Sequence, residues 1–217
     1  MFRTIVWMQW KSTRALALLT TIAAFALPLA SLKIGLDASS PANFVAAMQS
    51  FGSAYSLLAA LAGLLVALAA WRPDHAGRHV YALSLPVPRA RYAMFRFGAG
   101  LLFMLPTIAA LLVGALMVTF SGAIPDGLHA FPISLTLRFA LAAVVAYAIF
   151  FSIASSTNRT AGIIVAVIAG VIFTQYLMLV FTDRQQSVDL LGALSRFIFL
   201  RPGILSVFSG RWMLIDA

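Results

Sequence analysis

The sequence predicts an all-α membrane protein, a bundle of helices that crosses the bilayer several times. Hydrophobic residues make up 62% of the 217 residues and charged residues only 10%, against roughly a quarter in soluble domains. Five apolar runs approach or exceed the length of about 20 helical residues that crosses a hydrocarbon core. The basic residues behind the net charge of +9 lie mostly between these runs, which indicates membrane orientation rather than nucleic-acid binding.

The N-terminal segment, residues 1–14, mixes tryptophan and phenylalanine with arginine and lysine. This composition predicts a short helix that lies in the lipid headgroup region, followed by the first span at residues 15–32. A cleaved signal peptide is the alternative, because the apolar stretch ends in the cleavage-like sequence Ala26-Leu-Pro-Leu-Ala30-Ser31. The length and aromatic content of residues 1–14 favour the membrane helix.

The second apolar run, residues 44–71, is longer than one crossing. Its first two turns, which carry Gln49 and Ser50, are expected to stand outside the hydrocarbon or to tilt strongly. Three further spans are predicted at residues 97–120, 133–153 and 161–181. Pro106 is expected to kink the third span where neighbouring helices or hydroxyl groups satisfy the freed backbone.

The last segment, residues 182–217, has no uninterrupted apolar run. A sixth span there would contain Arg196 and Arg201, and a charged side chain at a helix centre costs about 2.5 to 3.5 kcal/mol on insertion scales. We therefore expect two short re-entrant or interfacial helices on the outer side of the membrane.

The distribution of lysine and arginine predicts the orientation. The N-terminal segment holds three, residues 72–96 hold five and residues 155–160 hold one, whereas the alternate connections hold only Lys33. Because cytoplasmic loops are enriched in these residues, the N-terminus and the connection at residues 72–91 are expected to face the cytoplasm. The chain is thus predicted to be a multi-pass protein of the cell membrane.

Small residues recur at helical spacing in two of the predicted spans. Gly162, Ala166 and Gly170 lie in the fifth, and Ala59 and Gly63 in the second. Such residues let two helix backbones approach closely. They predict either packing within the bundle, which we favour, or an interface with another subunit.

Catalytic motifs are missing from the sequence. It contains no cysteine and no phosphate-binding G-x-x-x-x-G-K-[ST] motif, so the chain is not expected to bind ATP. His75 and His79 are four residues apart beside Asp74, but a structural pair on a polar helix is favoured over a metal site. No aspartate or histidine falls within a predicted span, which disfavours both an intramembrane enzyme and an ion-coupled carrier.

The cytoplasmic connection at residues 72–91 has the features of a docking element. Asp74 is a candidate cap for a short helix that runs to about Leu85 and is ended by Pro86. Val80 and Leu83 form an apolar strip along it. The positive-inside rule explains the arginines of this connection, but an apolar strip and a rigid exit indicate contact with a partner.

These residues resemble a motif of the permease subunits of type-2 ABC transporters. That family has an acidic residue, a glycine three positions on, leucines, then Pro-x-x-Arg nine positions after the glycine and a basic residue seven positions after the arginine. The matching residues here are Asp74, Gly77, Leu83, Pro86, Arg89 and Arg96. The N-terminal helix, the long second span and the outer half-helices are similar too.

The resemblance implies a coupling helix that docks on a separate P-loop ATPase, which binds the ATP and magnesium, so this chain holds no cofactor. Two permeases, identical or paralogous, would surround the path of an amphipathic or lipid-like cargo among membrane lipids. The implied ATPase-coupling residues are Asp74, Gly77, Arg78, Val80, Leu83, Pro86, Arg89 and Arg96.

The chain also departs from the family pattern. The family usually has glutamate at the position of Asp74, threonine at the position of Arg78, and a sixth span. A membrane scaffold or assembly subunit that transports nothing is therefore the alternative function.

Overall fold

The structure is a computed structural model of the chain. It describes residues 2–36, 40–76, 88–122, 124–125, 127–156, 163, 166–167, 170, 173–174, 203–209 and 212–216. The chain divides into two compact units, Met1–Phe151 with Arg211–Ala217, and Ser152–Gly210. In the described part, four helical segments are long and apolar enough to cross a membrane, so the helical membrane class is confirmed. Most of the predicted fifth span, residues 161–181, lies outside the described residues.

Helix α1 runs from Phe2 to Leu36 without a break. The prediction of a separate helix at residues 1–14 is wrong in this respect, since the boundary with the first span lies inside α1. The sequence has no proline or glycine at this boundary to end the helix. The polar side chains near this boundary bond to the backbone of α1 itself. Thr13 Oγ1, for example, donates to the Gln9 carbonyl at 2.7 Å.

The second apolar run is divided into two helices, α2 (Pro41–Ser50) and α3 (Gly52–Ala76). Helix α2 begins after Ser40, whose side chain accepts a hydrogen bond from the Asn43 N–H at 3.3 Å. The two helices meet at Phe51 and Gly52. A Cβ at Gly52 would lie 3.1 Å from the Trp212 carbonyl oxygen, so glycine here admits the C-terminal segment closely.

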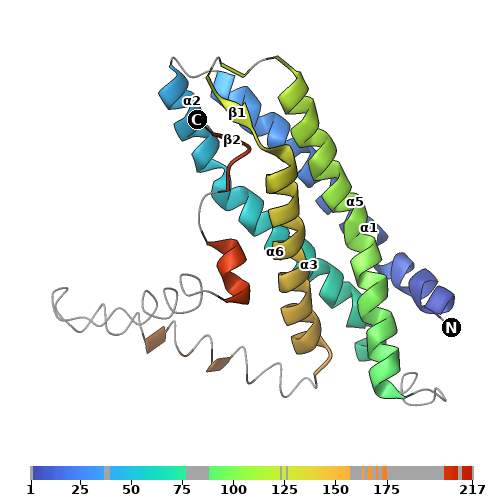
Figure 1. The fold of residues 1–217 in the computed structure, drawn as a ribbon. Coiled ribbons are helices and arrows are strands. Elements are labelled where there is room, and N and C mark those ends of the chain that lie inside the picture. The colour runs from blue at the N-terminus through green and yellow to red at the C-terminus, as the bar shows by residue number, and fades with distance from the viewer. Residues whose placement is uncertain are drawn as a thin grey trace. The chain divides into compact units, whose positions relative to one another are not determined.

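Helices α1 and α5 (Arg89–Phe120) lie side by side and run in the same direction (Figure 1). The Phe2 and Phe95 rings are 5.9 Å apart, and the hydroxyl oxygens of Thr20 and Thr107, later in both helices, are 3.0 Å apart. Helix α5 continues through Pro106, one residue before Thr107. The order of these contacts establishes the parallel arrangement.

Helix α6 (Pro132–Ala154) packs closely against α3 at Gly63. A Cβ there would lie 2.6 Å from the Tyr147 nitrogen and 2.8 Å from the Ala143 carbonyl oxygen. Ala59, one helical turn before Gly63, is fully buried. These two small residues therefore lie inside the first unit, where the packing alternative places them.

The connection between α5 and α6 pairs with the end of the chain. Strand β1 (His129–Ala130) is antiparallel to strand β2 (Ile215–Asp216), and the Phe131 N–H donates to the Leu214 carbonyl at 2.8 Å. The outer helices predicted within residues 182–217 thus do not include 212–216, which contain strand β2 and no helix. Pairing with β1 satisfies the backbone groups of a segment too short to form a stable helix.

The second unit begins with the last turn of α6, and its other described element is the 3-10 helix η2 (Ile204–Phe208). Ala166 and Gly170 are helical and exposed, and a Cβ at Gly170 would meet nothing within 4 Å. Gly162 lies outside the described residues.

Candidate functional site

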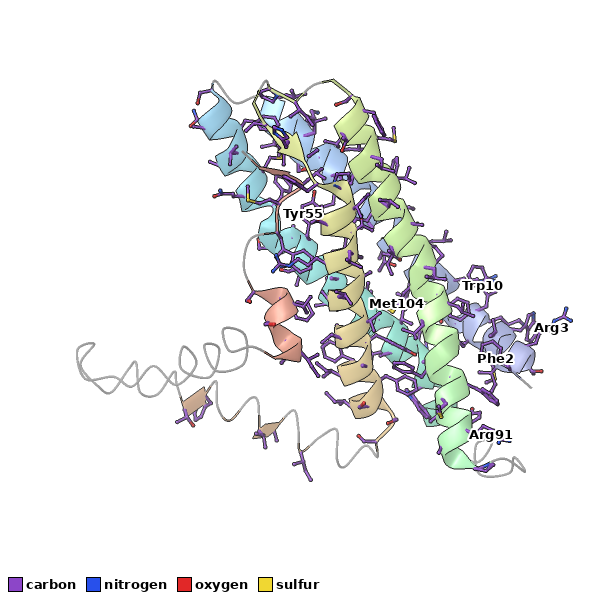
Figure 2. All side chains as sticks on the ribbon, in the orientation of Figure 1. Phe2, Arg3, Trp10, Tyr55, Arg91 and Met104 are labelled. Atoms are coloured by element: carbon purple, nitrogen blue, oxygen red, sulfur yellow. The ribbon has the colours of Figure 1, made fainter. Side chains whose placement is uncertain are left out.

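The candidate site is the pair of helix ends that flank the predicted docking connection. Helix α3 ends at Ala76 and α5 begins at Arg89, so these helices are the two stems of the intervening segment. Arg96 of α5 joins them, because its Nη1 donates to the Ala70 carbonyl of α3. Its Nε donates to the Tyr92 hydroxyl at 2.8 Å. Figure 2 labels Arg91 at this end of α5.

Helix α1 contacts the end of α3 at the Ala69 carbonyl, which Pro73 leaves without its helical hydrogen-bond donor. Pro73 lies within α3 and has no N–H, so the Ala69 carbonyl four residues earlier loses its helical donor. The Ser12 hydroxyl of α1 lies 3.2 Å from this carbonyl and 2.9 Å from the Gln9 carbonyl of its own helix, so its single proton has two acceptors. Side chains of α1 and α5 therefore lie against the neighbouring carbonyls of Ala69 and Ala70 in the last turns of α3.

Aromatic rings surround the Arg96 side chain, which is only 1% exposed. Its guanidinium lies 5.4 Å from the centre of the Trp71 ring and 5.0 Å from the centre of the Tyr92 ring, within the range of cation–π attraction. Hydrogen bonds and rings together compensate for the burial of a charge that would otherwise be unfavourable here.

Tyr147 brings α6 into the same cluster. Its hydroxyl donates to the Phe97 carbonyl at 3.2 Å, and its ring stacks on Phe97 with a centroid distance of 4.9 Å. Phe151, one turn later on α6, lies 5.3 Å from the Trp71 ring. We call this cluster the stem junction, and its members are Ser12, Ala69, Ala70, Trp71, Tyr92, Arg96, Phe97, Tyr147 and Phe151.

The predicted coupling residues fall into three groups. Gly77, Arg78, Val80, Leu83 and Pro86 lie outside the described residues. Asp74 lies in the last turn of α3, and most of the short helix that it was predicted to cap or to lie near falls outside the described residues. The helix of the span continues to Ala76 because the donors from Ser12 and Arg96 support it around Pro73.

Arg89 is the first residue of α5, directly after the Pro88 N-cap, as expected for a chain that leaves a proline turn. Arg96 lies two turns further on and is buried. Its side chain therefore acts on the two stems, and it is not presented on the surface where a partner would dock.

Three buried polar atoms near this end have no hydrogen-bond partner among the described residues. They are the amide nitrogen and oxygen of Gln9 and the indole nitrogen of Trp71. Gln9 is 2% exposed and lies one turn before Ser12 on α1. A buried amide without a hydrogen-bond partner lowers the free energy of unfolding. The stability of a Gln9 variant therefore tests this environment.

The arrangement is suited to mechanical coupling. Within the described part of the chain, no three histidine, cysteine or acidic residues gather as metal ligands. The stem junction instead links α1, α3, α5 and α6 through side-chain bonds to backbone atoms and through stacked rings.

Sequence reasoning missed the inward direction of Arg96 and the role of Ser12. One signal was available, since Pro73 in a helix predicts a free carbonyl at Ala69 that needs a donor from elsewhere. The class that fold and site define is a helical membrane protein with at least four candidate spans. No family model, curated protein or solved structure matches the chain.

Proposed function

We propose that this chain is the permease subunit of an ATP-driven exporter of the type-2 ABC class, with its N-terminus in the cytoplasm. A separate ATPase subunit would bind and hydrolyse ATP and would dock on the segment between α3 and α5. Two permease subunits would enclose the cargo path.

The observation that carries the proposal is the Arg96 bond to the Ala70 carbonyl. The motif assigns the docking surface to the segment between the two stems, and this bond joins the two stems to each other. A docking segment on independent stems would deflect locally, whereas joined stems transmit a push to the spans. The junction supports coupling for this reason.

The force would follow the contacts of the stem junction. Ser12 links α3 to α1 at Ala69, and Tyr147 links α6 to α5 at Phe97. Closure of an ATPase dimer beneath the segment between the stems would then tilt four helices together. In this mechanism Arg96 is a positioning residue, and residues such as Leu83 make the contact with the ATPase.

The test uses charge reversal in the docking segment. The full chain carries an affinity tag and is purified from its native membrane with the associated ATPase, which is identified by mass spectrometry. Leu83→Glu and Arg78→Glu are expected to abolish co-purification of the ATPase. Arg91→Glu is the matched control, because Arg91 is exposed at the same end of α5 but lies outside the motif.

The outcomes separate the two functions considered. Loss of the ATPase in the Leu83 and Arg78 variants but not in the Arg91 variant supports the exporter. Retained association and transport with both Leu83 and Arg78 replaced would contradict it. Absence of any ATPase from the purified complex, with other membrane proteins present, favours the scaffold.

A further inference from the structure

The first turns of α1 carry a face of uniform chemical character. Arg3, Trp7, Trp10, Lys11 and Arg14 are all exposed, and their spacing of three or four residues puts them on one side of the helix. We call these five residues the basic-aromatic face. The chain has no acidic residue before Asp37, so no neighbouring carboxylate on α1 offsets its three positive charges.

Residues on the opposite side of α1 pack against the rest of the first unit, and this packing keeps the basic-aromatic face turned outward. Ile5, Gln9 and Thr13 are buried, and the Phe2 ring contacts Phe95 of α5. Helix α1 cannot rotate about its axis without exposing these residues. Figure 2 shows Arg3 pointing away from the other helices.

Two tryptophans make the chemistry of the face more specific than that of a basic patch. Trp7 is 59% exposed, with the Lys11 ammonium 3.9 Å from its ring centre, and Trp10 is 45% exposed beside Phe103 of α5. Tryptophan is enriched where membranes meet water, because its ring is apolar and its N–H is polar. Lysine and arginine bind phosphate groups.

The length of α1 places this face near a membrane surface. Helix α1 has 35 residues. At 1.5 Å per residue it is about 50 Å long, while the hydrocarbon core is only about 30 Å thick. The apolar run begins at Ala15, so the turns before it reach the headgroup layer.

We infer that the basic-aromatic face is a binding surface for the phosphate groups of anionic phospholipids in the adjoining leaflet. The cations pair with the headgroups while the two tryptophan rings lie at the boundary of the acyl chains. An acidic protein surface would match the charges, but two large exposed rings next to the start of a span fit a lipid boundary better. This site would anchor the helix that Ser12 links to the stem junction.

The test measures lipid preference in the full chain reconstituted in bilayers. Mixtures of phosphatidylcholine and phosphatidylglycerol, one of them with brominated acyl chains, report the relative binding constant through quenching of tryptophan fluorescence. The signal comes mainly from Trp7 and Trp10, because Trp71 and Trp212 are 6% and 3% exposed. Trp7→Phe with Trp10→Phe should remove most of the quenching.

The decisive variant replaces Arg3, Lys11 and Arg14 by glutamine. Each basic residue near an anionic surface contributes about fivefold to binding, so we expect the preference for phosphatidylglycerol to fall about 10- to 100-fold. The matched control replaces three other exposed basic residues, Lys33, Arg72 and Arg91, by glutamine and should keep most of the preference.

Two results would overturn the inference. One is an unchanged preference in the variant without Arg3, Lys11 and Arg14, and the other is an equal loss in the control. If this variant keeps its lipid preference but loses a protein that co-purifies with the native chain, the face binds an acidic partner instead. The measurement needs no ATPase, so it is independent of the proposed transport function.

Discussion

The two ends of the first unit are held together by different interactions. At the stem junction, polar side chains from α1 and α5 bind the carbonyls of Ala69 and Ala70, and rings surround a buried arginine. At the other end, the C-terminal segment adds a strand to residues 129–130 and buries the apolar side chains of Trp212, Leu214 and Ile215. The stem end thus combines side-chain bonds to helix carbonyls with a ring cluster, and the other end combines a short strand pairing with buried apolar side chains.

Two arginines, Arg96 and Arg138, differ in their burial. Arg96 is buried and donates to a backbone carbonyl and a tyrosine hydroxyl. Arg138 of α6 is partly exposed, with its guanidinium 4.8 Å from the centre of the Trp212 ring.

The largest effect on stability is expected from Trp212→Ala. Trp212 is 3% exposed and its ring lies over the Arg138 guanidinium, so removal of the indole leaves a cavity and uncovers the guanidinium. We expect the free energy of unfolding to fall by about 3 to 5 kcal/mol. Denaturant unfolding of the purified chain in detergent micelles measures this change.

Trp7→Ala is the matched control for Trp212, because Trp7 is 59% exposed. Its effect in detergent should stay within about 1 kcal/mol. Equal losses in the two variants would show that the apolar end is not held by burial of Trp212.

A smaller effect is expected from Arg96→Leu. Hydrogen bonds to charged groups contribute about 1.5 to 3 kcal/mol, and the variant leaves the Ala70 carbonyl and the Tyr92 hydroxyl without this donor. We expect a loss of about 2 kcal/mol in the free energy of unfolding. Arg96→Lys should lose less, because an ammonium group retains the charge but cannot reproduce the fork of Nε and Nη1.

The distinctive readout for Arg96 is coupling. If the junction transmits force, Arg96→Leu retains the bound ATPase but uncouples its hydrolysis from transport, while Arg91→Leu leaves both unchanged. Normal transport by a folded Arg96→Leu protein would show that the junction serves stability alone.

The apolar spans could be predicted from the sequence because the length of an apolar run is a local property. Residues 133–153 match α6 almost from end to end, and residues 97–120 fall within α5, which begins two turns earlier at Arg89. The continuity of α1 could not be predicted, because Gln9 and Thr13 are polar in sequence and become interior only through contact with other helices.

The candidate site shows the same limit. Its position between the second and third spans follows from charge and proline spacing alone. The direction of Arg96 does not, since the motif spacing is the same whether the side chain faces a partner or Ala70. Only the packing of α5 against α3 decides this, and it depends on residues about 25 positions apart in the chain.

The smallest change in the free energy of unfolding is expected from Gln9→Leu. Unlike the variants above, this substitution is not expected to destabilise the protein. The Gln9 amide is buried with no hydrogen-bond partner among the described residues, so leucine of similar size removes an unfavourable group. We expect the free energy of unfolding to stay unchanged or to rise by about 1 kcal/mol.

Thr13→Val, one turn later on α1, is the matched comparison for Gln9. The Thr13 hydroxyl is buried and bonded at 2.7 Å to the Gln9 carbonyl, so its removal should lower stability by about 0.5 to 1 kcal/mol. If Gln9→Leu destabilised the protein as well, the amide would have a partner outside the described residues, such as water, cargo or another part of the chain. Polar interactions at the stem end would then extend beyond the helices, and the contrast with the apolar end would be sharper.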